Sequence, residues 1–410
     1  MRRLPVSLKS TLALFAALLL LASGAAGPAA HARETKSGAQ DTAKPPVKPP
    51  AVDAKGWAVA DADSGRLLVG KDPDERLPIA STTKIMVVLV ALDEGANLDE
   101  EVTVSPNAAS YAGFTYSNIG LFAGDRVSVR ELMLAALVPS ATDAVYALAE
   151  HLGDGRVKDC VDQMNKKADE MGLKNTHFEN PAGLDSPKHY SSARDLIKIT
   201  DAALKYPVFR KMVATTEATI TTQDRKIKFY TTNDLLSTYP PANGVKTGTT
   251  PSGGASLVSS AESGGESYIA VVLDATSYEE RFVGSRKILE YAFDNYERET
   301  LIPKNKVYGT INVPYHRGES IKLASAKDVK ALVGKGAQVE RRVTKKKAPD
   351  SVEAGQELGE IEVFAGGQRL GSTPLVAEKG YEKASLWTRT RYGAGGLFMR
   401  LRDWVTGLLK

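Results

Sequence analysis

Three short segments carry side chains that could form a nucleophilic site. The first is Ser81-Thr82-Thr83-Lys84, directly before an apolar run over residues 85–92 that predicts a helix. Residues three apart on a helix share a face, so Ser81 and Lys84 would be neighbours. A serine hydroxyl needs an adjacent base to act as a nucleophile, and a lysine can be that base only where burial or a second cation lowers its pKa. Alone, the segment is equally explained by Ser81 capping the helix.

The other two segments supply hydroxyl groups and a second lysine. One runs from Ser140 to Asp143 (SATD) and the other from Lys246 to Thr249 (KTGT), ahead of residues 255–258, which predict a strand edge facing the nucleophile. A lysine there can hold a substrate carboxylate as a point charge, and its charge would lower the pKa of Lys84. Either segment alone is more typical of a surface turn.

The elements that must position these segments alternate between helices and strands. Two strands at 57–60 and 67–69 flank an Asp-Ser-Gly turn, which indicates a hairpin. Helical patterns cover 132–152 and 157–171, a short apolar strand covers 268–273, and an amphipathic helix covers 281–296. We therefore expect one α/β domain over residues 53–300.

The pattern changes after that domain. Residues 307–313, 320–323, 338–343 and 360–364 are short strand candidates separated by Gly and Pro, which indicates a small all-β domain over 301–386. It contains no recognisable catalytic constellation.

The N-terminus predicts export. Arg2, Arg3 and Lys9 precede an apolar run, and Ala30-His31-Ala32 offers a small-x-small cleavage site, so residues 1–32 read as a signal peptide. The alternative is an uncleaved signal anchor, although the run is shorter than the ~20 residues that span a bilayer. Residues 33–52, rich in Lys and Pro, predict an extended linker.

The C-terminal stretch, residues 387–410, predicts an amphipathic helix. Its apolar residues fall within an arc of about 140° at helical spacing. They are Leu397, Phe398, Leu401, Trp404, Val405, Leu408 and Leu409. Arginines on the opposite side and a tryptophan at the apolar edge are typical of a helix lying in the lipid interface. The alternative is a helix packed on the β-rich domain.

Charge and composition exclude several classes of function. Removing residues 1–32 leaves 50 basic and 49 acidic residues, and no dense basic stripe is present, so we expect no nucleic-acid partner. The single cysteine, Cys160, sits on the apolar side of a helical pattern and predicts a small buried residue. The histidines are scattered without ligand spacing, so we expect no metal and no other cofactor.

Taken together and in order, the three segments resemble the active-site motifs of penicillin-binding proteins and class A β-lactamases. More specifically, the chain resembles the low-molecular-mass D-alanyl-D-alanine carboxypeptidases. The similarity is carried by residues 78–86, 143–144, 148–150, 178–185, 232–236 and 244–250. It implies a serine β-lactamase/transpeptidase-like α/β (α+β) domain, followed by a small all-β domain and a C-terminal amphipathic membrane-anchor helix.

The resemblance also implies a role for each motif residue. Ser81 would be the acylated nucleophile and Lys84 its base. Ser140 would bridge Lys84 and Lys246 and relay a proton to the leaving D-alanine. Lys246, with the Thr247 and Thr249 hydroxyls, would hold the terminal carboxylate, and Arg281 would help to bind it. Gly248 belongs to the same substrate-binding motif, and the N–H groups of Ser81 and Thr249 would form the oxyanion hole. Arg281 reads equally well as a surface arginine at a helix start.

One motif residue departs from the family pattern. Thr142 stands where the family usually has an asparagine that holds the substrate's amide, and a hydroxyl is shorter, with a single donor. The loss could be on the order of 1–3 kcal/mol of substrate positioning.

The expected partners are peptidoglycan stem peptides, β-lactam antibiotics and the outer face of the cytoplasmic membrane, contacted peripherally. Three alternatives stay open: a β-lactamase, a transpeptidase, and a non-catalytic wall-binding protein. A β-lactamase would need a Glu-x-x-Leu-Asn segment between Ser140 and Lys246, and none occurs there.

Overall fold

The computed structural model describes residues 47–316 and 318–392. The predicted signal peptide, most of the linker over 33–52 and the apolar residues of the predicted anchor helix lie outside this part of the chain.

A five-stranded antiparallel sheet forms the centre of the α/β domain, with strand order β2-β1-β9-β8-β7. Its strands are β1 (Ala54–Asp61), β2 (Leu67–Lys71), β7 (Ala242–Thr250), β8 (Gly254–Ser263) and β9 (Glu266–Ala275). Successive side chains of a strand point to opposite faces. Trp57 and Val59 accordingly join one hydrophobic core, and Ala58 and Ala60 join another. Both faces of the sheet are therefore buried, which explains the apolar run in β9.

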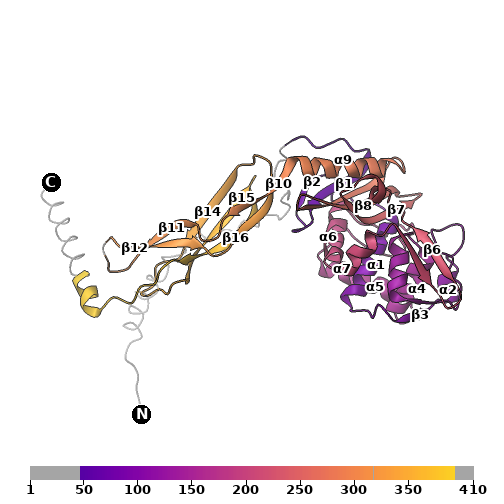
Figure 1. Cartoon of the computed structure of the whole chain (residues 1–410), viewed down its shortest axis with the longest axis horizontal. Helices are drawn as coiled ribbons and strands as arrows, with labels where there is room; N and C mark the ends of the chain where they lie inside the picture. Colours follow the sequence, from indigo (N-terminus) through magenta and orange to yellow (C-terminus); the bar gives the residue numbers. More distant parts are fainter. Residues whose placement is uncertain (1–46, 317, 393–410) are drawn as a thin grey trace, which may run out of the picture. The chain divides into compact units, whose positions relative to one another are not determined.

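Helices cover the two faces of this sheet. The helix α9 (Glu280–Asn295) lies on one side, and a larger group of helices lies on the other (Figure 1). That group comprises α1 (Lys84–Asp93), α3 (Val129–Leu137), α4 (Thr142–Leu152), α5 (Val157–Glu170), α6 (Ala193–Leu204) and α7 (Pro207–Val213). Shorter elements are η1 (Ala80–Thr83), α2 (Pro106–Ala109), α8 (Leu235–Thr238), and the strand pairs β3 (Glu101–Thr103) with β4 (Arg126–Ser128) and β5 (Glu217–Thr221) with β6 (Lys226–Tyr230).

The single helix predicted over 132–152 is wrong, because the chain breaks between α3 and α4. Pro139 has no N–H to continue the helical hydrogen bonds. Ser140 follows with a φ of 67°, in the left-handed region that non-glycine residues rarely adopt. The break places Ser140 at the turn between two helices instead of on a helix surface.

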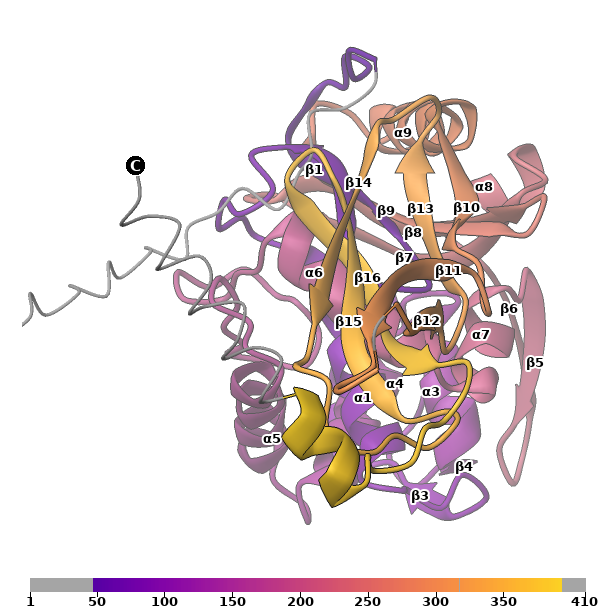
Figure 2. The same cartoon turned by 90° about the vertical axis from the view of Figure 1, so that its left-hand side faces the viewer.

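The second domain is β-rich and close to a barrel. One sheet has the order β11-β12-β16-β15-β14, and β10 pairs with β13 in another; β14, β15 and β16 run side by side in Figure 2. The strands are β10 (Tyr296–Ile302), β11 (Val307–Asn312), β12 (Ser320–Ser325), β13 (Val329–Gly334), β14 (Val339–Lys345), β15 (Glu357–Ala365) and β16 (Gln368–Ala377). Apolar residues such as Leu323, Ile361 and Leu375 form its core. A short helix over 386–392 follows. The predicted order of an α/β domain and an all-β domain is confirmed, although β10, β13 and β16 were not predicted.

Candidate active site

The structure brings Ser81 and Lys84 together at the junction of η1 and α1. Lys84 Nζ lies 2.8 Å from Ser81 Oγ. Lys84 is fully buried, and this burial lowers its pKa to about 7, although the nearby Asp143 carboxylate acts in the opposite direction. A substantial fraction of Lys84 is therefore neutral near pH 7 and able to accept the Ser81 proton.

A backbone carbonyl that the sequence did not single out completes this pair. Lys84 Nζ donates to the Ala182 carbonyl at 3.1 Å, and Ser81 Oγ lies 3.4 Å from the same oxygen. The Asn180 side chain builds the turn that presents it, because its oxygen accepts from the N–H groups of Ala182, Gly183 and Leu184. The Asn-Pro-Ala-Gly stretch within residues 178–185 was the sequence signal from which this turn could have been predicted.

Gly183 is required where this turn meets the nucleophile. Its φ is +81°, and a Cβ added there would lie 1.8 Å from the Ala80 carbonyl oxygen and 2.9 Å from Ser81 N. Any other residue would collide with the peptide that precedes the nucleophile.

The second motif lies at the start of α4 and is held by its neighbours. Ser140 and Thr142 are buried, and the Thr142 N–H donates to the Ser117 carbonyl at 2.7 Å. The expected bridge from Ser140 to Lys84 and Lys246 is absent from the described residues: Lys84 Nζ instead contacts Ser81 and Ala182, and Lys246 Nζ donates to the Thr247 carbonyl. The Asp143 carboxylate accepts from the N–H groups of Ile119 and Leu121. Its negative charge also favours the protonated form of Lys84 and so raises the pKa of that amine.

The third motif lies in β7, the edge strand of the central sheet. Residues 255–258, expected to form an edge facing the nucleophile, instead lie in β8 between β7 and β9, so that prediction is wrong. Lys246 and Thr247 are buried, and Thr247 Oγ1 lies 2.5 Å from Thr232 Oγ1. Burial holds the pKa of Lys246 well below its usual range, and the charges of Lys84 and Arg281 lower it further.

A second glycine lets this strand approach the nucleophile. A Cβ added at Gly248 would lie 2.9 Å from the Ile79 carbonyl oxygen and 3.2 Å from Ser81 N. The β7 backbone therefore packs directly against η1. The next side chain, Thr249, is exposed beside this contact.

Arg281 belongs to the same group of residues. It is 1% exposed, so the surface-arginine interpretation is wrong. Its Nη1 donates to the Gly248 carbonyl at 3.2 Å and to Thr249 Oγ1 at 2.9 Å. The Tyr278 ring stacks on the guanidinium at 3.7 Å. Nε and Nη2 have no hydrogen-bond partner within the described residues. Two buried donors are thus left for another group.

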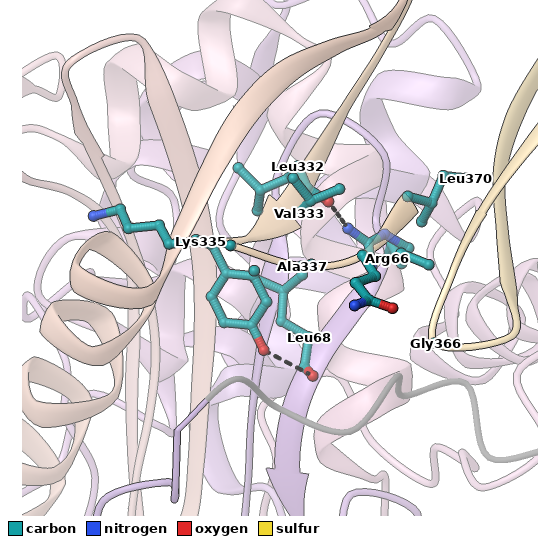
Figure 3. A pocket seen from close by; sticks show the side chains of 13 residues that line it. Arg66, Leu68, Leu332, Val333, Lys335, Ala337, Gly366 and Leu370 are labelled. Carbon is teal, nitrogen blue, oxygen red and sulfur yellow. Dashed lines mark hydrogen bonds between the residues drawn. The ribbon is translucent and has the colours of Figure 1, made fainter. Parts of the chain in front are cut away.

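A separate cavity of about 390 Å³ contains none of the three motifs. It is lined by residues that include Arg66, Leu68, Tyr296, Leu332 and Leu370 (Figure 3). Arg66 donates to the Leu332 carbonyl, and the Tyr296 hydroxyl donates to the Leu68 carbonyl at 3.5 Å.

The described residues contain no group of three or more His, Cys, Asp or Glu side chains arranged to hold a metal ion. Cys160 is buried, as predicted, and burial raises the pKa of its thiol to about 12, which makes it inert.

Comparison with known proteins assigns both domains. Residues 41–277 match the D-alanyl-D-alanine carboxypeptidase family, and residues 296–383 match the C-terminal domain of penicillin-binding protein 5. The chain is 35% identical to the D-alanyl-D-alanine carboxypeptidase DacF of Bacillus subtilis, over 82% of this chain and 88% of that protein. It is 33% identical to DacA of Haemophilus influenzae, over 89% and 91%.

Solved structures agree with this assignment. Penicillin-binding protein 5 of Haemophilus influenzae superposes with a TM-score of 0.68 at 32% identity, covering 82% of this chain and all of that one. A Streptomyces DD-transpeptidase superposes with a TM-score of 0.57 at 37% identity, covering 60% of this chain and all of that one.

Proposed function

Because this chain belongs to the D-alanyl-D-alanine carboxypeptidase family and is a serine-type enzyme acting on peptidoglycan, we propose that Ser81 is its nucleophile and Lys84 its base. The observation that carries the assignment is the 2.8 Å contact between Lys84 Nζ and Ser81 Oγ, with the lysine fully buried. The substrate is a stem pentapeptide, from which the enzyme removes the terminal D-alanine.

The reaction has two halves. Neutral Lys84 takes the Ser81 proton as Oγ attacks the carbonyl carbon of the penultimate D-alanine. The N–H groups of Ser81 and Thr249 stabilise the tetrahedral oxyanion, where one donor is typically worth about 3 kcal/mol. The C–N bond then breaks, and Ser140 relays the proton from Lys84 to the leaving amine. Water hydrolyses the resulting ester on Ser81 and regenerates the serine.

The third motif and Arg281 bind the terminal carboxylate. Lys246 supplies a positive charge when the carboxylate is bound, because a nearby anion favours the protonated amine and opposes the lowering of its pKa by burial. The Thr247 and Thr249 hydroxyls supply hydrogen bonds. The unpartnered Nη2 and Nε groups of Arg281 are supporting evidence, because a buried donor without a partner costs about 1–3 kcal/mol. A carboxylate beside Thr249 would satisfy them.

The nucleophile is tested by covalent labelling with a fluorescent penicillin, because a β-lactam mimics the acyl-D-alanyl-D-alanine end of the stem. Purified protein should be labelled on the peptide that contains Ser81, and Ser81→Ala should abolish labelling. Ser351→Ala, at an exposed serine of the β-rich domain, is the matched control and should label fully. Labelling that persists in Ser81→Ala would overturn the assignment.

An amine could replace water in the second half-reaction, as the name of the Streptomyces DD-transpeptidase suggests for that relative. We propose that water is the acceptor here. Mass spectrometry of a synthetic stem pentapeptide, incubated with and without an amine, distinguishes a tetrapeptide product from an amide-linked one.

We propose that residues 1–32 are removed on export and that the helix over 387–410 holds the enzyme on the outer face of the cytoplasmic membrane. Among the described residues, no helix is both long and apolar enough to cross a bilayer. The sequence pattern of the tail supports interfacial binding instead. Deletion of residues 395–410 should abolish co-sedimentation with lipid vesicles. Leu401→Asp with Val405→Asp should release the protein and leave penicillin labelling intact.

A further inference from the structure

A buried histidine outside the three motifs contacts the segment that carries the nucleophile, through Thr83. His189 is 4% exposed, and its Nδ1 accepts a hydrogen bond from the Glu179 N–H at 3.1 Å. A backbone amide can only donate, so Nδ1 carries no proton. Burial lowers the pKa of His189 to about 4, so the ring is neutral near pH 7. The proton of a neutral imidazole must then be on Nε2.

This proton fixes the direction of a chain of hydrogen bonds. His189 Nε2 lies 2.8 Å from Thr83 Oγ1, and Thr83 Oγ1 lies 2.8 Å from the Ala80 carbonyl oxygen. The histidine N–H donates to the hydroxyl, and the single hydroxyl proton is left for the carbonyl. The series of hydrogen bonds therefore runs from the Glu179 amide through His189 and Thr83 to the Ala80 carbonyl.

The Ala80 carbonyl shares a peptide unit with the Ser81 N–H. In a planar trans peptide the C=O and the N–H point in opposite directions, so fixing one fixes the other. Ala80 has a φ of 47°, a left-handed conformation that costs a residue with a Cβ roughly 1–2 kcal/mol. This peptide orientation is thus not the intrinsically preferred one, and its surroundings must hold it.

We propose that His189 and Thr83 are positioning residues that aim the Ser81 N–H at the substrate oxyanion. The inference rests on the proposed function, in which this N–H is one of two oxyanion donors. His189 moves no proton in the reaction. It keeps the Thr83 hydroxyl oriented toward Ala80, and Gly183 leaves room for that carbonyl on the other side.

The test is a matched pair of variants at Thr83, the middle residue of this series of hydrogen bonds. Thr83→Val removes the hydroxyl at nearly the same shape, whereas Thr83→Ser keeps it. Pre-steady-state kinetics with a β-lactam separate non-covalent binding from the acylation step. Thr83→Val should lower the acylation rate constant about tenfold or more, short of the 10²–10³-fold typical for removal of a whole oxyanion donor. Thr83→Ser should stay near the unmodified enzyme.

A transition-state analogue distinguishes positioning from a general structural role. A D-alanine-derived boronic acid forms a tetrahedral adduct with the serine and places an oxygen in the oxyanion hole. Its affinity for Thr83→Val should fall by the same factor as the acylation rate, whereas non-covalent β-lactam binding should not change. His189→Gln, which retains an acceptor and a donor, should lose much less than His189→Leu, and this pair decides the matter if Thr83→Val does not fold.

Two results would overturn the positioning role. One is a Thr83→Val variant that is acylated as fast as the unmodified enzyme. The other is a Thr83→Val variant that loses non-covalent β-lactam binding and boronate affinity by the same factor. Either result is distinguishable from failure of the proposed function, because labelling that survives Ser81→Ala removes the nucleophile itself, whatever Thr83 does.

Discussion

The two domains differ in where their charged side chains lie. The α/β domain buries Lys84, Lys246 and Arg281, each no more than 1% exposed. In the described part of the β-rich domain, the buried polar side chains are the hydroxyls of Ser325 and Thr373, and none is charged. Its ions lie on the surface in pairs such as Arg369 with Glu362.

This difference has a consequence for the stability of each domain. Desolvating an ion costs several kcal/mol unless partners compensate, whereas an exposed ion pair changes stability by only about 0–1 kcal/mol. Burying three basic side chains around the three motifs therefore costs stability, which indicates that they are kept for function. The β-rich domain avoids that cost, because its interior is apolar and its ions lie on the surface.

The largest effect that tests this contrast comes from deleting the buried amine next to Ser81. Lys84→Ala should lower the rate of penicillin acylation by on the order of 10⁴-fold, because a nucleophile and its base act as a unit. Lys346→Ala, which breaks an exposed pair with Glu357 in the β-rich domain, should leave the rate unchanged. Stopped-flow acylation of both variants is the measurement. A loss below tenfold in Lys84→Ala would mean that another group is the base.

The sequence alone was sufficient to predict those features whose signal lies within one helix or strand. The apolar run after Ser81 predicted α1, the run around Val271 predicted β9, and the amphipathic pattern after Arg281 predicted α9. The i to i+3 spacing of Ser81 and Lys84 also predicted a contact that the structure contains. Each of these follows from periodicity within one element.

The remaining features depend on contacts between distant parts of the chain. The Ala182 carbonyl reaches Lys84 across 98 residues, and His189 reaches Thr83 across 106. Local periodicity carries no information about such pairs. The break between α3 and α4 was different, because Pro139 is a local signal for it that the predicted helix over 132–152 did not take into account.

A second contrast sets the buried arginine against an exposed one. Arg281→Gln should lower kcat/KM for a D-alanyl-D-alanine peptide roughly 10–100-fold, because hydrogen bonds to charged groups contribute about 1.5–3 kcal/mol. Arg342→Gln, at an exposed pair with Glu340, should have no effect. Steady-state kinetics with a free-carboxylate peptide and its amide make the comparison sharper. An equal loss for both peptides would show that Arg281 does not recognise the carboxylate.

A gain is expected at the position that departs from the family pattern. Thr142 is buried at the start of α4, with its backbone held by Ser117. Thr142→Asn should raise kcat/KM for D-alanyl-D-alanine peptides by up to about tenfold, because an amide offers both a donor and an acceptor to the substrate. Thr142→Val should lower it. An unchanged or lower value in Thr142→Asn would mean that the pocket is adapted to threonine.

The smallest expected effect concerns the electrostatics of the base. Since burial lowers the pKa of Lys84 to about 7, acylation should fall as the pH drops below that value and the amine becomes protonated. The Asp143 charge favours the protonated amine. Asp143→Asn should therefore lower the pKa of Lys84 further, and move the acid limb of the pH–rate profile to lower pH.

The control for this shift is a second carboxylate that holds the same loop. Asp125 is also buried, accepts from the Phe122 N–H at 2.8 Å and pairs with Arg225, whereas Asp143 is the carboxylate whose charge raises the pKa of Lys84. Asp125→Asn should loosen the loop and leave the acid limb in place, whereas Asp143→Asn should give a few-fold higher ratio of the rate at pH 6 to the rate at pH 8. If both variants shift the limb equally, loop position rather than charge sets the pKa of the base. If neither shifts it, Asp143 supports the loop alone, and burial by itself accounts for the neutral lysine.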